Sequence, residues 1–562
     1  MTKFMCGSVV SSFLMRWIFL NFLVGFCLAC LPAYSSGEPE RRSADSEEWH
    51  SALYPANWTP EFRDAEGRFL HDFSFAGYRF GETPPEAVEG EWVNVTEAPY
   101  LADSSGEQDS TTAIQQALDE VGKAGGGVVY LPAGTYRIAP IGEDSVALRL
   151  RYSGVVLRGA GAGETFLYSD DFQMRKKVLI SVEPGEATSW NADGKDYPGI
   201  LLVSDEPTPT QQISLAEVEG LAVGDAVVIR NDLTQHYIDR VGMTGKWEPA
   251  QSRNRTLTYY RRITRIDPEH NVVTVDIPVR GYLYQADNAR VVPVTGEMIR
   301  EVGVEDFSIG MAYHPGEGDG LRDFLQEGTL AYEVHGSAVI RFKMAENGWV
   351  RRVNTYAPEG NPPQVHILSN ALQLERSRGI SVLHCDLRFP QYRGEGGNGY
   401  LYTMQGQDNL VEECYAEAGR HNFSFGTMSA SGNVIVDCYS KDGWLGSDFH
   451  MFLSLANLFD SVTCEGDFLE ARALRPWGGK VMHGVTTTES VFWNTCGLRY
   501  SEKQPYLIFS HQFGDGYIIG TRGPAYEVKT SDFAEGIGKG ETLVPRSLYE
   551  DQRMRRVGTV VE

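Results

Sequence analysis

The sequence predicts an all-β protein, a single-stranded right-handed parallel β-helix with an N-terminal capping helix and one β-rich insertion. Three observations predict it: short apolar runs recur at coil-like intervals, one helical segment precedes a glycine-rich strand pattern, and 60 of the 562 residues are glycine. We place the β-helix at residues 101–540. Repetitive β folds grow to this length as one unit, because each coil buries its apolar face against the next.

The repeat is clearest in the second half of the chain. Short apolar or β-branched runs close at residues 354, 385, 414, 438, 464 and 494, so the steps are 31, 29, 24, 26 and 30 residues. Steps of this length, without helical periodicity, are typical of β-solenoid coils. Stacking places equivalent side chains about 4.8 Å apart. We therefore expect one interior column made of Asn354, Cys385, Cys414, Cys438, Cys464 and Asn494.

The cysteines do not indicate a disulfide framework. Three of the eight fall within residues 1–36, and the other five are an odd number with no C-x-x-C pair. This pattern argues against complete disulfide pairing and against a zinc site. Buried thiols pack as small apolar groups, which suits an interior column.

Residues 109–119 predict a helix at the start of the repeat. Asp109 or Ser110 can cap it, apolar residues follow at helical spacing, and glycines 125–127 come just after its end. A strand pattern occupies residues 128–138, and residues 154–163 provide tight turns one coil later. A helix across the open end of a solenoid would cover an edge that could pair with other chains.

The segment D-S-T-T-A-I-Q-Q-A followed by G-G-G-V-V-Y-L-P-A-G-T-Y resembles the N-terminal cap and first coils of the pectate-lyase-like β-helix superfamily, which includes rhamnogalacturonase- and epimerase-type domains and phage tailspikes. The resemblance implies the fold. It does not imply one activity, because this scaffold carries lyases, hydrolases, epimerases and binders. Among the sequence signatures of polygalacturonase-type hydrolases, the chain has only a partial match, Met482-His483-Gly484. The resemblance therefore assigns no catalytic residue.

Residues 1–36 predict a signal peptide. Lys3 and Arg16 precede an apolar run of 15 residues at 17–31, and small residues follow. The run is shorter than the roughly 20 residues of a spanning helix. We expect a secreted protein, extracellular or periplasmic, with no transmembrane segment in the mature chain. Cys30 leaves a lipid anchor open.

Three further regions differ from the repeat. Residues 37–100 are irregular and should pack along the outside of the solenoid. Residues 213–293 contain strand patterns without coil spacing and predict the β-rich insertion. Residues 541–562 form a charged C-terminal tail that we expect to be peripheral.

The charge balance excludes one class of partner. The chain has 50 Lys and Arg against 75 Asp and Glu, a formal charge of −25. Nucleic-acid binding requires a basic surface, so we expect no nucleic-acid partner. An acidic polysaccharide remains compatible if one strip of the surface is locally basic.

Such a strip is predicted by cations and imidazoles that follow successive coil positions. The candidate catalytic residues are His421, Arg420, His450 and Asp448. The candidate substrate-binding residues are Arg393, Tyr392, Arg472, Arg475, His483 and Trp444.

These residue types suit β-elimination of a uronate-containing glycan. Arginine can clamp the carboxylate in bidentate fashion, and histidine can act as base or acid near neutral pH. Asp448 would orient a histidine or help to bind a metal. We therefore expect a polysaccharide lyase. No ligand spacing requires a metal, and a divalent cation such as calcium stays open as a cofactor.

Two other functions stay open. A glycoside hydrolase would need paired carboxylates, for which Glu395, Asp442, Asp448, Asp460 and Asp467 are candidates. A non-catalytic carbohydrate-binding or adhesion solenoid would use aromatic side chains that stack on sugars, namely Tyr392, Tyr400, Tyr402, Trp444 and Trp477. For Arg420 and His421 the alternative is a purely structural role, in which they hydrogen-bond backbone carbonyls at a coil corner. The oligomeric state and the sugar are not predicted.

Overall fold

The computed structural model describes residues 47–85, 90–185, 199–249, 256–296, 298–477 and 482–558. The chain divides into two compact units, residues 1–47 and 48–562, and every helix and strand of the described residues belongs to the second. The predicted signal peptide lies outside the described residues and stays a prediction. None of the described helices is long and apolar enough to cross a bilayer.

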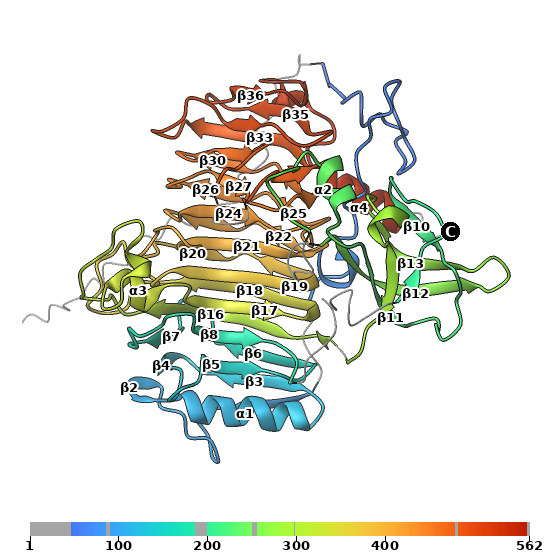
Figure 1. Ribbon diagram of the computed structural model, residues 1–562. Coiled ribbons are helices and arrows are strands. Elements are labelled where there is room, and N and C mark those ends of the chain that lie inside the picture. Colours follow the sequence, from blue (N-terminus) through green and yellow to red (C-terminus); the bar gives the residue numbers. More distant parts are fainter. Residues whose placement is uncertain are drawn as a thin grey trace, which may run out of the picture. The chain divides into compact units, whose positions relative to one another are not determined.

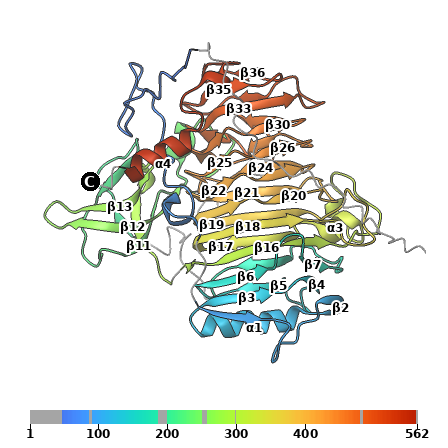
Figure 2. The ribbon, with the colours of Figure 1, turned by 180° about the vertical axis from the view of Figure 1, so that it is seen from behind.

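The predicted parallel β-helix is confirmed. One 29-stranded sheet is wound so that equivalent strands of successive coils pair in parallel, and they stack as rungs in Figures 1 and 2. Each coil contributes up to three strands, which form three faces. The solenoid begins at Glu91, ahead of the predicted boundary at residue 101.

The first face contains β1 (Glu91–Asn94), β3 (Gly127–Leu131), β6 (Val155–Gly159), β16 (Gly303–Met311), β18 (Ala345–Thr355), β19 (Asn370–Leu383), β22 (Leu410–Glu412), β25 (Val434–Val436), β29 (Leu458–Asp460), β33 (Val491–Arg499), β35 (Tyr517–Arg522) and β37 (Phe533–Glu535). The second face contains parts of β16, β18 and β33 together with β2 (Ser105–Asp109), β4 (Gly134–Arg137), β7 (Thr165–Ser169), β20 (Asp386–Arg388), β23 (Tyr415–Glu417), β26 (Tyr439–Lys441) and β30 (Thr463–Glu465).

The third face contains the N-terminal part of β19 together with β5 (Val146–Leu150), β8 (Val178–Val182), β17 (Ala338–Lys343), β21 (Tyr400–Gln407), β24 (His421–Phe425), β27 (Ser447–Phe449), β31 (Leu469–Ala471), β34 (Ile508–Ser510) and β36 (Val528–Thr530). The short strand β15 (Ile299–Arg300) pairs in parallel with Ala345 and Glu346 at the start of β18. The short elements outside these faces include α3 (Leu330–Val334), and β28 (Ser454–Leu455) paired with β32 (Thr487–Thr488). Single 3-10 turns are η1 (Tyr78–Gly81), η2 (Gln285–Asp287), η3 (Asp323–Leu325) and η4 (Gly540–Thr542).

The predicted cysteine column is confirmed for three of its members. The amides of Cys385 and Cys414 each donate to the sulfur of the next cysteine, Cys414 and Cys438, at 3.4 Å. The prediction is wrong for Cys464, which lies opposite Ser440. Thr463 pairs with Tyr439, so the column continues at the residue before it, Val462. Val462 and Cys464 are both buried, and burial raises the pKa of the thiols of Cys385, Cys414 and Cys464, so these three are inert packing groups.

Asparagines form a separate column. The side-chain amide of Asn409 donates to Asn433 at 2.9 Å, and that of Asn433 donates to Asn457 at 2.8 Å. Such a ladder satisfies buried polar groups at a coil corner, where backbone pairing is interrupted. Asn354 and Asn494 belong to neither column, which corrects the prediction for both.

The predicted N-terminal helix is α1 (Thr111–Lys123), which lies across the first coil in Figure 1. Its apolar side, with Ile114, Leu118 and Val121, is buried in the main core. The glycines after it are required by close backbone approach. Gly126 has φ +112°, and a Cβ there would lie 2.6 Å from the carbonyl oxygen of Gly154.

The β-rich insertion is a separate antiparallel sheet that begins at residue 200, ahead of the predicted boundary at 213. Its strand order is β10-β13-β12-β11-β14-β9, and it also carries the helix α2 (Gln235–Arg240). The strands are β9 (Ile200–Leu201), β10 (Thr210–Ser214), β11 (Ala226–Arg230), β12 (Thr258–Asp267), β13 (Val272–Val279) and β14 (Arg290–Pro293).

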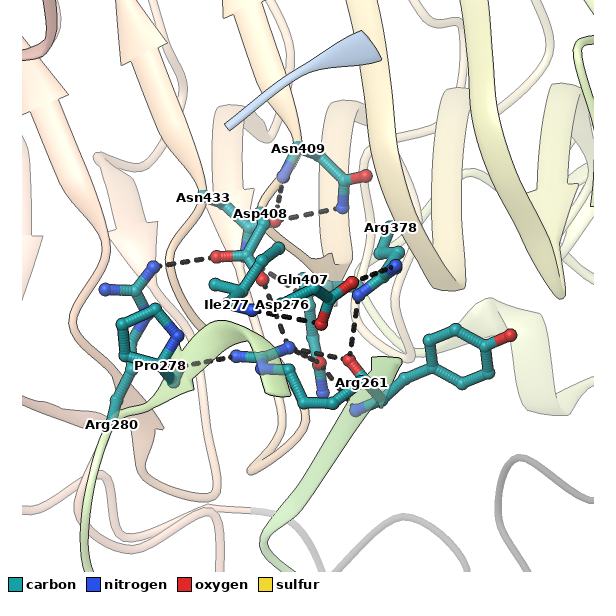
Figure 3. A network of polar contacts seen from close by, with 12 residues as sticks. Arg261, Asp276, Ile277, Pro278, Arg280, Arg378, Gln407, Asp408, Asn409 and Asn433 are labelled. Atoms are coloured by element: carbon teal, nitrogen blue, oxygen red, sulfur yellow. Dashed lines mark hydrogen bonds and ion pairs between the residues drawn. The ribbon is translucent and has the colours of Figure 1, made fainter. Parts of the chain in front are cut away.

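Buried ion pairs hold this insertion against the solenoid (Figure 3). Arg280 of the insertion donates to Asp408 of the solenoid at 2.7 Å, and Arg261 lies 3.3 Å from the other oxygen of Asp408. In the opposite direction, Arg378 of the solenoid donates to Asp276 of the insertion at 2.7 Å. These side chains are almost fully buried. Because an unpaired buried charge is costly, each sheet completes the charges of the other.

The two ends of the described chain meet on the outer side of the first face. Residues 47–85 are irregular, and Tyr54 and Phe73 from this segment form a buried cluster with Leu548 and Tyr549 from α4 (Leu548–Gly558). The cluster packs on strand residues such as Val434. The expectation of a peripheral C-terminal tail is therefore wrong for α4. Its apolar residues are too few to show helical periodicity among the charged ones, so the sequence pattern does not reveal its buried side.

Asp460 joins α4 to the solenoid. Its Oδ2 accepts hydrogen bonds from the hydroxyl of Ser547 at 2.7 Å and from the amide of Tyr549 at 2.9 Å. Ser461 donates to Oδ1 at 3.1 Å. Burial raises the pKa of Asp460 to about 7, although these hydrogen bonds favour its charged form.

Replacing Asp460 should flatten the dependence of stability on pH. The pKa of Asp460 in the folded protein is raised above its ordinary value, so its contribution to the free energy of unfolding is largest near pH 4. That contribution falls as the pH rises toward 7, because the unfolded chain ionises first. Unfolding temperatures of wild type and Asp460→Asn, measured from pH 4 to pH 8, should differ in slope over this range. Glu550→Gln on the same helix is the control, and an equal slope in all three proteins would contradict the prediction.

Candidate active site

Most predicted site residues converge on the third face, at β21, β24, β27 and β31. Strand register brings His421 opposite Tyr400, and Asp448 between Ser424 and Glu470. Side chains alternate along a strand, so Ser424, Asp448 and Glu470 point away from the core residues next to them, whereas Tyr400 and His421 occupy the first positions of β21 and β24. Phe423, Phe425, Phe449, Leu469 and Ala471 are the core members.

Asp448 is the centre of the cluster. Its Oδ2 lies 2.6 Å from Nη1 of Arg475, 2.9 Å from Nδ1 of His450 and 3.2 Å from Nδ1 of His421. Ser424 donates its hydroxyl to Oδ1 at 2.7 Å. The carboxylate is fully buried, and four polar neighbours satisfy it.

Arg475 is an internal counter-charge. It is 3% exposed and also donates to Glu470 at 2.5 Å. The expectation that Arg475 binds substrate is therefore not met by its position. Arg472 donates to the same Glu470 at 2.6 Å and keeps a third of its side chain exposed, so it can still reach a ligand.

The electrostatics assign a charge state to each group. Burial alone would raise the pKa of Asp448, but His421, Arg475 and His450 hold it well below its usual range. Burial lowers the pKa of His421 to about 3 and also lowers that of His450. Burial, and then the charge of Asp448, raise the pKa of Tyr400. Near neutral pH the site thus holds neutral imidazoles, an ionised Asp448 and a protonated phenol.

His450 is the most exposed member of this cluster, and Tyr400, which is 8% exposed, lies next to it. The hydroxyl of Tyr400 lies 3.2 Å from Nε2 of His450, whose side chain is 16% exposed. His421 is 2% exposed, packs its ring against Tyr400 and places Nδ1 2.7 Å from the carbonyl oxygen of Gly446. His421 can therefore position Tyr400 but not reach a substrate, and the Tyr400 hydroxyl and His450 are close enough to exchange a proton.

His483 lies beside this pair. Its ring centroid is 5.1 Å from that of His450, and burial lowers its pKa to about 4. The insertion helps to hold it, because Trp247 donates its indole N–H to the carbonyl of Met482 at 2.8 Å. Gly484 and Arg475 pair their backbones on the other side.

Of the four remaining predicted residues, Arg420, Arg393 and Trp444 gather at one corner, and Tyr392 is buried. The guanidinium groups of Arg420 and Arg393 lie 5.2 and 6.0 Å from the ring centroid of Trp444, at the corner that precedes β24 and β27. Tyr392 is 1% exposed and its hydroxyl contacts the carbonyls of Gly320 and Leu321 at 3.2 Å. Tyr392 is therefore a packing residue, which corrects its predicted contact with substrate.

Tyr400, Ser424 and Glu470 belong to the site but were not among the predicted site residues. Tyr400 was predicted only as a stacking surface for sugars. Once the coils are in register it stands opposite His421, so aligning the coils by their strands could have revealed it.

The cluster has the ligand types of a metal site. Ligand atoms of His421, Asp448 and His450 lie within 4.8 Å of one another, the one such group found among the described residues. However, Nη1 of Arg475 is 2.6 Å from Asp448 Oδ2 and 2.7 Å from His450 Nδ1. A guanidinium therefore occupies the position that a cation would need, so these residues do not fit a bound ion.

Residues 92–195 match the family model described as "Rhamnogalacturonase A/epimerase, pectate lyase-like". This confirms the predicted resemblance over the N-terminal helix and first coils. The matched span ends before every candidate site residue, so it carries no information on their roles.

Two curated relatives come from Azotobacter vinelandii. Alginate lyase 7 is 47% identical over 90 residues, which are 16% of this chain and 10% of that protein. Mannuronan C5-epimerase AlgE4 is 40% identical over 97 residues, 17% of each. Across the curated relatives the match spans only 5% to 17% of their length.

Among solved structures, the tailspike gp61 of Pseudomonas phage phi297 is 12% identical, with 80% of this chain and 72% of that chain covered and a TM-score of 0.46. The A-module of the AlgE6 epimerase is likewise 12% identical, covers 79% of this chain and 96% of its own, and has a TM-score of 0.31. Scores below 0.5 carry no argument about function.

Because Arg475 fills the cation position, metal removal should leave the site intact. Treatment with a chelator should not change the unfolding temperature, and titration with Co²⁺ should not produce the visible spectrum of a tetrahedral histidine-bound ion. A stabilisation by Co²⁺ that is lost in His421→Ala would contradict this prediction.

Proposed function

We propose that the protein acts on an acidic, uronate-containing polysaccharide and cleaves it by β-elimination. The observation that carries the proposal is the contact between Tyr400 and His450, 3.2 Å apart, with the ionised Asp448 behind His450. The names of the relatives, an alginate lyase and mannuronan epimerases, support a uronate polymer. We also propose that the protein is exported, on the strength of residues 1–36.

The reaction begins with removal of the proton on the carbon next to the uronate carboxylate. The neutral imidazole of His450 has a free nitrogen lone pair for this proton, because burial lowers its pKa. The resulting negative charge spreads onto the carboxylate, which Arg420 would neutralise as a cation. The C4–O4 bond then breaks, its electrons leave with the oxygen, and a C4–C5 double bond forms.

Tyr400 can supply the proton that the leaving oxygen needs. Its raised pKa keeps the phenol protonated near neutral pH, and its contact with His450 lets the pair exchange the proton afterwards. Base and acid lie next to each other and so act on the same side of the sugar. This arrangement supports elimination over the other reactions.

Epimerisation is the second candidate, because several relatives are named mannuronan C5-epimerases. It shares the first step, but the proton must then return to the opposite side of the ring. Hydrolysis has less support. Asp448 is bound by the guanidinium of Arg475, Asp460 caps α4, and Asp467 accepts hydrogen bonds from Ser440 and Ser447. None of these three carboxyl groups is free to activate water.

Removing either member of the pair should abolish cleavage without unfolding the protein. Tyr400→Phe and His450→Asn should each lower turnover on polymannuronate by about 10²-fold or more, since each removes a proton-transfer group. Ultraviolet absorbance of unsaturated ends and reducing ends are measured together, and proton NMR in D₂O reports exchange at C5.

The matched control is His384→Asn, an exposed histidine at φ +53°, where asparagine is tolerated. Reducing ends without absorbance would replace the lyase by a hydrolase, and exchange without cleavage would replace it by an epimerase. Full activity in both variants would reject the pair as the catalytic groups.

A further inference from the structure

A third cation joins Arg393 and Arg420 at Trp444. Lys503, from the segment that follows β33, places Nζ 4.9 Å from the centroid of the indole ring and donates to the backbone carbonyl of Trp444. Arg420 also donates to the carbonyl of Arg393 at 3.0 Å, and Arg393 donates to that of Ala418 at 2.9 Å. Backbone carbonyls of separate coils thus hold three cationic groups around one ring.

These three cations have no acidic partner in the described part of the chain. None of them forms an ion pair with a described carboxylate within 4.0 Å, although the protein carries 75 acidic residues against 50 basic ones. Nearby Glu395 and Asp442 pair instead with Arg322 and Arg499. Like charges repel one another, and the interaction of a cation with an exposed ring is worth only about 0.5–1 kcal/mol. The local excess of positive charge is therefore available to an anion.

The position of the cluster relates it to the active site. Arg420 immediately precedes His421, and the amides of Trp444 and Leu445 donate to the carbonyls of Gly419 and Arg420 at 2.9 and 2.8 Å. This corner leads directly into β24 and β27, which carry His421 and Asp448. Lys503, in contrast, comes from a later coil. A polymer that lies across these coils can therefore contact Arg420 and Lys503 as well as His450.

We propose that Lys503, Arg393 and Trp444 form a binding subsite for the carboxylate of a second uronate, next to the one that reacts. Lys503 is the new element of this subsite, and the identity of the sugar rests on the proposed function. Arg420 lies between the two sites and can contact either carboxylate. The consequence is a preference for runs of consecutive uronates over polymers in which uronates alternate with neutral sugars.

The test measures binding in a His450→Asn background, so that turnover does not consume the ligand. Lys503→Gln in this background should weaken binding of oligomannuronate about 10-fold, the loss expected for one charge-assisted contact. Its affinity should also fall less steeply with added salt. Calorimetry is performed in parallel with a neutral cello-oligosaccharide, whose binding should not respond to the change.

Lys529→Gln is the matched control. Lys529 is an exposed lysine 5.6 Å from the ring of Phe509 on β34, so the change in charge is the same. Equal affinity of Lys503→Gln and Lys529→Gln for oligomannuronate would overturn the subsite. The circular dichroism spectrum and the unfolding temperature of each variant verify that the fold is retained.

The outcomes separate the two proposals. If Lys503→Gln loses affinity while the protein with His450 intact leaves every uronate polymer unchanged, the subsite stands and the proposed lyase activity fails. If the intact protein cleaves polymannuronate but Lys503→Gln matches Lys529→Gln in both affinity and KM, the lyase stands and the subsite fails.

Discussion

Parallel hydrogen bonding between equivalent strands is the constraint on which the rest of the structure depends. It sets the register of each coil on the next, and so it decides which side chains become neighbours across 20 to 30 residues of sequence. Asp448 meets His421 and Glu470 for this reason alone. A slip of one residue in β27 would turn Asp448 into the core and Phe449 out of it. The cysteine and asparagine columns and the stacked phenylalanines hold that register from within.

Buried carboxylates are stabilised in the same way, by buried charged partners, at two separate places. Asp408, where the insertion docks, lies between Arg261 and Arg280, and Asp448 lies between Arg475 and two histidines. A buried charge without such partners would cost several kcal/mol. The difference lies in what surrounds them. Arg261 and Arg280 close the first cluster completely, whereas His450 leaves the second one open to solvent.

The fold could be predicted because its signals are local. The helix at 109–119 and the recurring apolar runs need no knowledge of distant contacts, and both correspond to observed elements. The continuation of the cysteine column could not be predicted. Cys464 falls at a plausible coil length, but Val462, two residues earlier, occupies the next position of the column. The predicted start of the insertion lies after the observed one because Ile200–Leu201 is too short to give a strand pattern.

The site was predictable in location and less so in roles. His421, Asp448 and His450 come together as expected, since coil spacing already places them on one side. Tyr392 and Arg475 differ from the prediction because both side chains are buried. The spacing of residues along the chain does not show whether a side chain is buried or exposed. Lys503 was missed because no pattern marks it, and only the fold of a later coil brings it to Trp444.

The packing of α4 on the solenoid has a consequence for how the protein is made. A solenoid can add coils one at a time as the chain leaves the ribosome. The apolar strip formed by Leu410, Val434, Leu458 and Val491, however, is covered in part by Leu548 and Tyr549, which are synthesised after all of these strands. Until α4 has emerged and folded back, that part of the strip stays uncovered and can bind other apolar surfaces. Helix α4 therefore protects coils that were completed before it.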